Sequence, residues 1–301
     1  MAARLTAHQY GKAETRVVRI VRDTARHEIK DLNVSTALRG AFDAAYLEGD
    51  QSAVLPTDSQ KNTAFAFAKS RGVSSAEAYA LTLARHFVDD VVPVDAARVD
   101  VEEYAWTRVT VDGREHDHTW VRTGGEVRTT AVTVEGTGDA QTVAVVSGVR
   151  DLVVLKSTGS QFRGFLTDPY TTLPETDDRI LATSLVVQWR YAGTDVAWDA
   201  AYATIRATML EQFAEVHSLA LQQTLWHMGS AVLDRVPEVV EVRLAAPNKH
   251  HFLADLSPFG LDNPGEVFHA GDRPYGLIEA VLTRDDAPPA GAAWTRSVGA
   301  P

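Results

Sequence analysis

The sequence predicts an α+β protein made of two similar halves, each an antiparallel sheet of long strands with helices on one face. Strand-like stretches, such as TRVVRIVRD at residues 15–23, place Val17, Arg19 and Val21 on one side and Val18 and Ile20 on the other. Other stretches carry apolar residues at helical spacing. The elements follow one another as strands, helices and strands, and this order then occurs again without a sequence repeat. We place the two halves at residues 1–140 and 141–301.

In the first half, residues 15–23 and 27–36 are expected to pair as strands. The segment VSSAEAYALTLARHFVDDVV is expected to form a helix, because Ser74 and Glu77 match an S-x-x-E capping box and Pro93 ends the pattern. The buried face of this helix is predicted to carry Tyr79, Ala80, Leu83 and Phe87.

Strands resume after this helix, and the dipeptides Asp112-Gly113 and Gly124-Gly125 mark turns between them. In the second half, strands are expected at residues 141–156, 182–192, 238–246, 251–256 and 276–284. A long helix is indicated by apolar residues at helical spacing, which are Trp198, Tyr202, Ile205, Met209 and Phe213. A second helix is expected at residues 218–235.

Composition narrows the class of protein. The chain has 301 residues, of which 45% are hydrophobic and 23% charged, the balance of a soluble globular protein. The formal net charge of −11 argues against a nucleic-acid partner, which requires clustered lysine and arginine. There is no cysteine, so disulfides and thiolate metal sites are excluded and a cytosolic location fits. A membrane span is not expected, because no run of about 18 apolar residues occurs.

The stretch LPTDSQKNTAFAFA, residues 55–68, places polar side chains directly before an apolar segment. Such a cluster is either a helix cap, for which Ser59 and Asn62 are candidates, or part of a site. At a helix start, the backbone N–H groups also favour a bound anion. The residues alone leave both interpretations open.

Histidines occur in two further clusters. His116 and His118 share one face of a strand and form a possible metal pair, but two imidazoles without a third ligand favour a solvated hairpin. The segment NKHHF, which includes Asn248 and His250, either holds a ligand or forms a polar turn.

The long segment from Leu155 to Ser184 has few apolar residues but contains the aromatic residues Phe162, Phe165 and Tyr170. A loop of this length in a compact domain is usually functional or disordered, and the aromatic residues favour function. Together with Arg179, they suit a flat anionic ring, which an aromatic face can stack on and a guanidinium can hold. Neither a nucleotide-binding glycine motif nor a G-x-S-x-G elbow is present.

Several of these segments resemble the urate oxidase family. The segments that carry the resemblance lie in the same order from about residue 9 to 284, and they are QYGKAE, PTDSQKNT, the loop at 155–183, HSLALQQTLWHMG, and PNKHHF followed by EVF and GLIEA. The resemblance implies two tandem tunnelling-fold domains, at 1–140 and 141–301, with helices on the outer face of each sheet. It further implies that chains pair into a β-barrel and that two barrels stack as a homotetramer around a tunnel.

The resemblance also implies the reaction. Members of this family convert urate, O2 and water to 5-hydroxyisourate and hydrogen peroxide in purine degradation, with no metal or organic cofactor. By motif, the proton relay falls on Lys12, Thr57 and His250. The substrate-binding positions fall on Thr57, Asp58, Phe162, Arg179, Leu221, Gln222 and Asn248. Thr57 and Asp58 of one chain are expected to face Phe162, Arg179 and Gln222 of a neighbour.

Two other functions compete with this one. Enzymes of the same fold act on pterins or guanine nucleotides, commonly with a metal or a glutamate anchor, whereas Arg179 and Gln222 favour urate. A purine-binding protein without activity is disfavoured by the presence of Lys12, Thr57 and His250. Neither nucleic acid nor membrane is an expected partner. Because the sequence ends in SVGAP rather than the peroxisomal S-K-L, we expect a bacterial-type cytoplasmic enzyme.

Overall fold

The computed structural model describes residues 3–295, so the terminal SVGAP segment lies outside the described residues. The described part is an α+β structure, and every strand pair with a recorded register is antiparallel, which confirms the predicted fold class. The chain divides into two compact units. Unit 1 comprises residues up to 148, 190–200 and from 288 onward, and unit 2 comprises residues 149–189 and 201–287.

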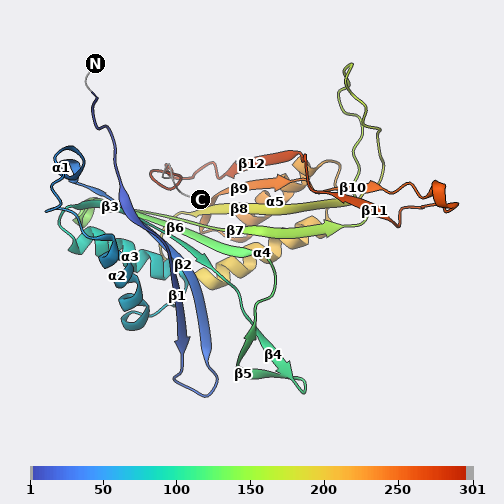
Figure 1. Ribbon diagram of the computed structural model, residues 1–301. Coiled ribbons are helices and arrows are strands. Elements are labelled where there is room, and N and C mark those ends of the chain that lie inside the picture. Colours follow the sequence, from blue (N-terminus) through green and yellow to red (C-terminus); the bar gives the residue numbers. More distant parts are fainter. Residues whose placement is uncertain (1–2, 296–301) are drawn as a thin grey trace. The chain divides into compact units, whose positions relative to one another are not determined.

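In unit 1, the strands follow the hydrogen-bonding order β1-β2-β3-β6, and β4 and β5 form a separate hairpin (Figure 1). Helix α2 packs on β1, and helix α3 packs on β3 and β6. The elements are β1 (Tyr10–Val21), β2 (Glu28–Gly40), α1 (Asp43–Leu47), α2 (Thr57–Ser70), α3 (Ala76–Asp90), β3 (Val94–Glu103), β4 (Thr107–Val111), β5 (Arg114–Val121) and β6 (Val127–Glu135).

In unit 2, the order is β7-β8-β9-β12, helix α5 packs on β9 and β12, and β10 pairs with β11. The elements are β7 (Thr142–Lys156), β8 (Leu181–Tyr191), α4 (Trp198–Glu215), α5 (Leu221–Arg235), β9 (Val239–Pro247), β10 (His250–Leu253), β11 (Phe268–Gly271) and β12 (Leu277–Thr283). Because β7 and β8 each have residues in both units, the boundary predicted between residues 140 and 141 stays a prediction.

In each half of the described chain, two strands are followed by helices and then by four strands, so the order of strands, helices and strands occurs twice, as the sequence pattern indicates. The predicted face of helix α3 is confirmed, since Tyr79, Ala80, Leu83 and Phe87 are all buried. Asp112 and Gly113 both have positive φ and turn the chain between β4 and β5, as expected. Alternation of apolar residues therefore identified the strands, and helical spacing identified the core face of the helix.

Some element boundaries differ from the prediction where residues bond outside their own element. The predicted helix at 218–235 begins only at Leu221, because Ser218 pairs with Ser160 instead. The short strand β11 and helix α1 were not predicted. The strand expected at 251–256 is shorter, since only His250–Leu253 pairs with β11.

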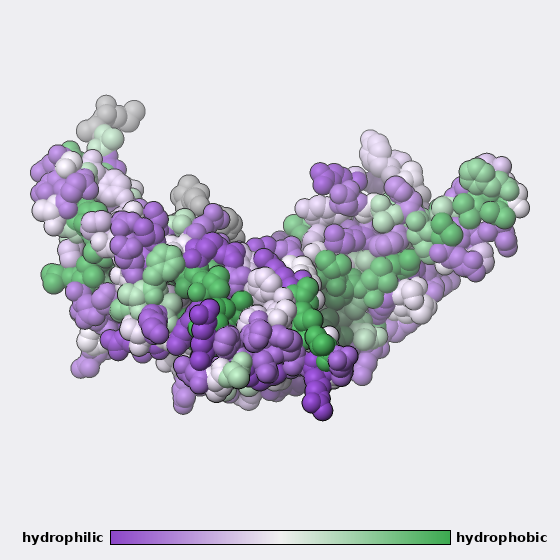
Figure 2. Space-filling model, turned by 60° about the horizontal axis from the view of Figure 1, so that its bottom comes forward, coloured by the Kyte–Doolittle hydropathy of each residue, from purple (hydrophilic) through white to green (hydrophobic). Residues whose placement is uncertain are grey.

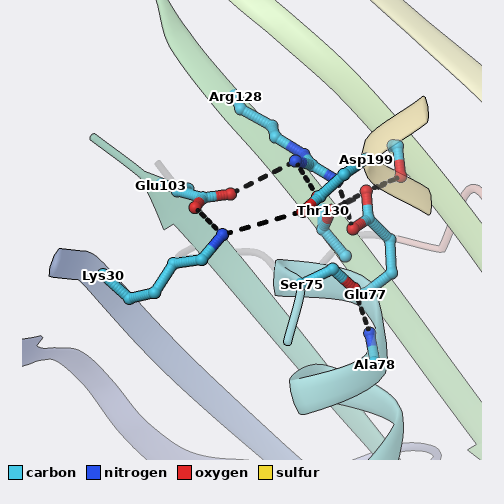
Figure 3. Close-up of polar contacts among 9 residues, drawn as sticks. Lys30, Ser75, Glu77, Ala78, Glu103, Arg128, Thr130 and Asp199 are labelled. Atoms are coloured by element: carbon cyan, nitrogen blue, oxygen red, sulfur yellow. Dashed lines mark hydrogen bonds and ion pairs between the residues drawn. The ribbon is translucent and has the colours of Figure 1, made fainter. Parts of the chain in front are cut away.

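The start of helix α3 corrects the predicted capping box. The N-cap is Ser75 rather than Ser74, and its side chain accepts the Ala78 N–H at 3.1 Å. Glu77 does not return to the cap. Its fully buried carboxylate accepts hydrogen bonds from Arg128 Nη2 at 2.6 Å and from Thr130 Oγ1 at 3.0 Å (Figure 3).

This carboxylate belongs to a larger ionic network within unit 1. Arg128 also pairs with Asp199, with 2.6 Å between Nη1 and Oδ1, and Lys30 pairs with Glu103 at 2.8 Å (Figure 3). Burial alone would lower the pKa of Arg128, but the charges of Glu77, Glu103 and Asp199 outweigh burial and raise it. Glu77 is therefore a structural residue, which holds helix α3 to strand β6.

Candidate active site

The first group of expected site residues lies at the start of helix α2 in unit 1. Thr57 is its first residue, and the preceding Pro56 has extended backbone angles that suit a helix entry. No side chain caps this helix, so the expected capping by Ser59 and Asn62 is wrong. Thr57 is half-buried and makes no side-chain hydrogen bond within the described residues, while Asp58 is exposed.

Asp58 is held by neighbours one turn further along the helix. Its carboxylate pairs with Lys61 and accepts a hydrogen bond from Asn62 Nδ2 at 2.9 Å. The hydrogen bond and charge of Lys61, followed by Asn62 and the charge of Lys12, hold the pKa of Asp58 below its ordinary value. Asp58 is therefore ionised at neutral pH, and its orientation is fixed.

Lys12 lies on strand β1 directly opposite Thr36 of β2. Side chains of directly opposed residues in an antiparallel pair point to the same face of the sheet. Thr36 faces helix α2, because its hydroxyl donates to the buried Gln60 of that helix at 2.6 Å. The Lys12 side chain is therefore on the face where Thr57 and Asp58 lie, which agrees with the effect of its charge on Asp58.

The second group lies in unit 2 and is built on the long loop between β7 and β8. The loop is tied to the segment before helix α5, since Gln161 N donates to Ser218 O at 2.8 Å and Ser218 N donates to Gly159 O at 2.9 Å. It also closes on itself, because Arg179 N donates to Ser160 O at 2.8 Å. These bonds bring the two ends of the loop to the start of helix α5.

Within this loop, the Arg179 guanidinium carbon lies 5.0 Å from the centroid of the Phe162 ring. Phe165 stacks on Phe162 with 4.9 Å between ring centroids and an interplanar angle of 16°. Burial lowers the pKa of Arg179, and its Nε is buried without a hydrogen-bond partner among the described residues. A half-buried guanidinium with a buried, unpaired Nε–H suits interaction with an anion.

Asp178, beside Arg179, shapes the loop. It accepts from Thr158 Oγ1 at 2.8 Å and from Gly159 N at 3.0 Å, and these bonds, the Thr158 bond first, lower its pKa. The loop expected to be functional is therefore ordered by its own acidic residue.

Helix α5 begins with Leu221 and Gln222. Leu221 is only 3% exposed, so its side chain packs in the core and its backbone is the part able to face a ligand. Gln222 is exposed. The helix entry is fixed by Thr224, whose hydroxyl donates to Ser218 Oγ at 2.8 Å.

The NKHHF segment is attached to the end of strand β8 that follows Arg179. Asn248 forms a bridge with Thr183, and Lys249 N donates to Ala182 O at 2.8 Å. His250 begins strand β10, and its ring centroid lies 5.8 Å from that of Phe252. The segment is therefore hydrogen-bonded to β8 and continues into strand β10, which pairs with β11.

The expected residues therefore form two groups. Lys12, Thr57 and Asp58 come together in unit 1, and the remaining positions belong to unit 2. Sequence reasoning missed Thr36 and Gln60, which lie beneath the first group. Their only sequence signal is a polar residue at an expected core position of a strand and of a helix.

His116 and His118 lie on one face of the β4–β5 hairpin, with 4.5 Å between ring centroids. Within residues 3–295, no group of three or more His, Cys, Asp or Glu side chains is arranged to hold a metal ion. In the same range, no helix is both long enough and apolar enough to cross a membrane.

Comparison with known proteins gives one family. The family model described as Uricase matches residues 8–133 and 145–279. The chain is 48% identical to the uricase of Arthrobacter globiformis over 98% of this chain and 95% of that protein. It is 36% identical to the uricase of Danio rerio over 91% and 93%.

Solved structures agree with the sequence comparison. The crystal structure of uricase from Arthrobacter globiformis superposes with a TM-score of 0.90 at 49% identity, covering 96% of this chain and 98% of that chain. A uricase from Bacillus fastidious gives a TM-score of 0.80 at 26% identity, covering 95% and 96%. The two matched segments correspond to the two strand–helix–strand halves, which fits tandem tunnelling-fold domains. The chain belongs to the uricase family.

Proposed function

We propose that this chain is a urate oxidase, which converts urate, O2 and water to 5-hydroxyisourate and hydrogen peroxide in purine degradation. The urate ring loses two electrons, O2 gains them together with two protons to form H2O2, and water supplies the hydroxyl group at C5. The observation that carries the proposal is the half-buried Arg179 guanidinium beside the Phe162 ring, because it suits a planar anion.

The unit 2 residues are assigned to holding the substrate. Phe162 stacks on the urate ring, Arg179 binds its anionic edge, and the Gln222 amide binds the opposite edge with the Leu221 backbone. Asn248 holds O2 or water above the ring. These contacts supply orientation, which converts an encounter into a reaction without a chemically reactive side chain.

The unit 1 residues, with His250, are assigned to proton transfer. Lys12 takes a proton through the Thr57 hydroxyl, and Asp58 contributes to the binding of the ring. Thr57 suits this role because its hydroxyl makes no hydrogen bond within the described residues and is therefore able to face the substrate. Asp58 is already held by Lys61 and Asn62, so it keeps its charge when a ligand binds.

One assay tests the reaction. Purified protein is dialysed against EDTA and mixed with urate in oxygenated buffer, while urate absorbance, O2 and peroxide are followed. We expect one O2 consumed and one H2O2 formed for each urate, at the rate of undialysed protein. Activity that EDTA abolishes and a transition metal restores would overturn the cofactor-independent part of the proposal.

The same assay separates the competing functions. A purine-binding protein without activity would bind urate but leave its absorbance unchanged. An enzyme for pterins or guanine nucleotides would leave urate unchanged and consume one of those substrates. Arg179 and Gln222 favour urate, because a guanidinium and an amide suit the two edges of an anionic purine. The enzymes for pterins or guanine nucleotides commonly use a glutamate in that place.

We further propose that the enzyme is a homotetramer whose sites are shared between chains. Hydrophobic side chains are exposed on the face of the unit 2 sheet that the helices leave uncovered, and they are Val153, Leu155, Val186, Leu277 and Val281. Figure 2 shows further hydrophobic residues at the right of the view, at the tip of the segment between β10 and β11, where Phe259 is 75% and Leu261 is 60% exposed. Surfaces of this kind favour association between copies.

Mixing two inactive variants tests the shared site. Thr57→Ala and Arg179→Gln are each assayed alone and then refolded together. If each site takes one group from each chain, roughly a quarter of the sites regain both intact groups. Activity well above the mean of the two single variants supports sharing, whereas activity equal to that mean places both groups of one site on the same chain.

For location, we propose the cytoplasm. The support is the absence of cysteine from the sequence, which fits a reducing compartment. Fractionation of the source cells, with urate oxidase activity as the marker, tests it. Activity confined to a sealed compartment outside the cytoplasm would contradict it.

A further inference from the structure

Two buried polar side chains, Thr36 of β2 and Gln60 of α2, lie beneath the start of helix α2. Thr36 is 8% exposed and Gln60 is completely buried. The Thr36 hydroxyl accepts the backbone N–H of Lys12 at 3.2 Å and donates to Gln60 Oε1 at 2.6 Å. Gln60 Nε2 in turn donates to Leu55 O at 3.5 Å, in the segment that enters the helix. A continuous hydrogen-bonded path therefore joins Lys12 to the entry of helix α2.

Strand β1 is irregular at Lys12, so hydrogen bonds from side chains help to determine where Lys12 lies. The register of β1 against β2 shifts between Lys12 and Thr15, and Glu14 has a φ of 55°. In this region, side chains of β2 accept the backbone N–H groups of β1, since Glu14 N donates to Ser35 Oγ at 2.9 Å just as Lys12 N donates to Thr36. The position of Lys12 thus depends on the side chains of β2 more than on a regular ladder.

The close approach of the two strands supports this view. A Cβ at Gly11 would lie 1.7 Å from the Thr36 carbonyl oxygen, so only glycine fits beside Lys12. The backbone at Gly11, which precedes the Lys12 N–H, therefore lies close against β2 at Thr36. The Thr36 hydroxyl then links this part of the strand pair to helix α2, because it donates a hydrogen bond to Gln60.

We propose that Thr36 and Gln60 are positioning residues for the reaction, which set the Lys12 side chain against Thr57. This inference rests on the proposed function, because it takes Lys12 and Thr57 as the proton relay. Both linking groups are neutral. A carboxylate in the same place would favour the charged form of a nearby lysine and oppose its use as a base, whereas a hydroxyl and an amide hold the backbone without that effect.

Thr36→Val tests the inference, because it keeps the shape of the side chain and removes the hydroxyl. The Lys12 N–H and Gln60 Oε1 then lose their shared partner. Since small misplacements of reacting groups are costly, we expect kcat for urate to fall about ten- to a hundredfold while KM changes less than about twofold. The pH profile of kcat should shift as well, since the environment of the relay changes. Thr36→Ser retains the hydroxyl and should restore both.

A matched control separates positioning from stability. Thr15→Val alters another threonine of the same strand pair that is also 8% exposed, at a position outside the path. It should leave kcat and the pH profile unchanged. If Thr36→Val does not fold, Gln60→Met tests the other end of the path with the same measurements.

The outcomes distinguish this inference from the proposed function. Wild-type protein that does not consume urate refutes the proposed function and this inference with it. Active wild-type protein, with a folded Thr36→Val variant that has wild-type kcat and pH profile, refutes this inference alone. So does an equal loss in Thr15→Val, or a failure of Thr36→Ser to restore activity.

Discussion

Helices α2 and α3 follow each other in the chain, and both begin in a short run of polar residues, but the side chains of the two runs differ in their hydrogen bonding. At α3, Ser75 caps the helix and the Glu77 carboxylate is buried against Arg128, Thr130 and Ser147. At α2, no side chain caps the helix. Thr57 makes no side-chain hydrogen bond within the described residues, and Asp58 is exposed.

The difference teaches how to separate a structural polar cluster from a functional one. At α3, the hydrogen-bonding capacity of the side chains is satisfied inside the chain, as burial requires. At α2, neighbouring residues hold the cluster in place. Lys61 and Asn62 bind the Asp58 carboxylate, and Gln60 donates a hydrogen bond to Leu55 O at the helix entry. The Thr57 hydroxyl makes no hydrogen bond within the described residues, which suits the ligand contact that the proposed function assigns to it. Four substitutions test this comparison.

The largest effect is expected from Lys12→Met, on the α2 side. Loss of a general base typically costs about a hundred- to ten-thousandfold in rate, so kcat should fall by that much while KM stays near its wild-type value. Steady-state kinetics with urate measures both. Lys69→Met, in the last turn of the same helix, serves as the control and should be fully active. A variant that changes only KM would remove Lys12 from the relay.

Glu77→Ala probes the α3 side and should act on stability instead. It leaves the Arg128 guanidinium, whose side chain is 10% exposed, without its main carboxylate. Breaking a buried ion pair in this way costs about 3–5 kcal/mol in the free energy of unfolding, which urea denaturation measures. The kcat of the molecules that remain folded should be unchanged. A large loss of kcat at unaltered stability would make Glu77 functional and void the comparison.

Arg179→Gln tests the substrate-holding group with an intermediate effect. A hydrogen bond to a charged group contributes about 1.5–3 kcal/mol, so KM for urate should rise about ten- to a hundredfold, with a smaller fall in kcat. Arg163→Gln is the matched control, because it lies on the same loop and pairs with the exposed Asp177. Equal defects in both variants would show that loop structure, rather than the guanidinium of Arg179, determines substrate binding.

The smallest effect is expected from Ser75→Ala. Removal of an N-cap side chain costs about 1 kcal/mol in the free energy of unfolding. Because the side-chain hydrogen bond recorded for Ser75 lies at the start of its own helix, kcat and KM should not change. Ser74→Ala is the control, since the structure assigns no cap to that residue. If Ser74→Ala were the more destabilising variant, the observed cap would be wrong.

The fold was predictable from the sequence, because alternation and helical spacing are local signals. Leu32 and Val34 alternate with polar neighbours along β2, and Tyr79, Leu83 and Phe87 line helix α3. Cap positions are less predictable. Ser74 and Ser75 are equivalent in sequence, and only the conformation of the chain selects Ser75.

The candidate site rests on resemblance to a family, and the roles of its residues stay predictions. Local sequence leaves open whether Thr57 and Asp58 cap a helix or form a site. The role of Glu77 depends on Arg128 and Ser147, which lie on remote strands. Thr36 and Gln60 were missed for the same reason, because each makes its decisive hydrogen bond with the other.

The central claim is that the polar start of helix α2 serves a reaction rather than the helix. Thr57→Ala tests it most directly, with kcat for urate and the free energy of unfolding measured on the same preparation. We predict a fall in kcat of about a hundredfold or more, with the free energy of unfolding changed by less than about 0.5 kcal/mol. Thr57→Ser, which keeps the hydroxyl, should retain activity. A loss of about 1 kcal/mol in stability with wild-type kcat would show that Thr57 is a helix cap, and would contradict the account.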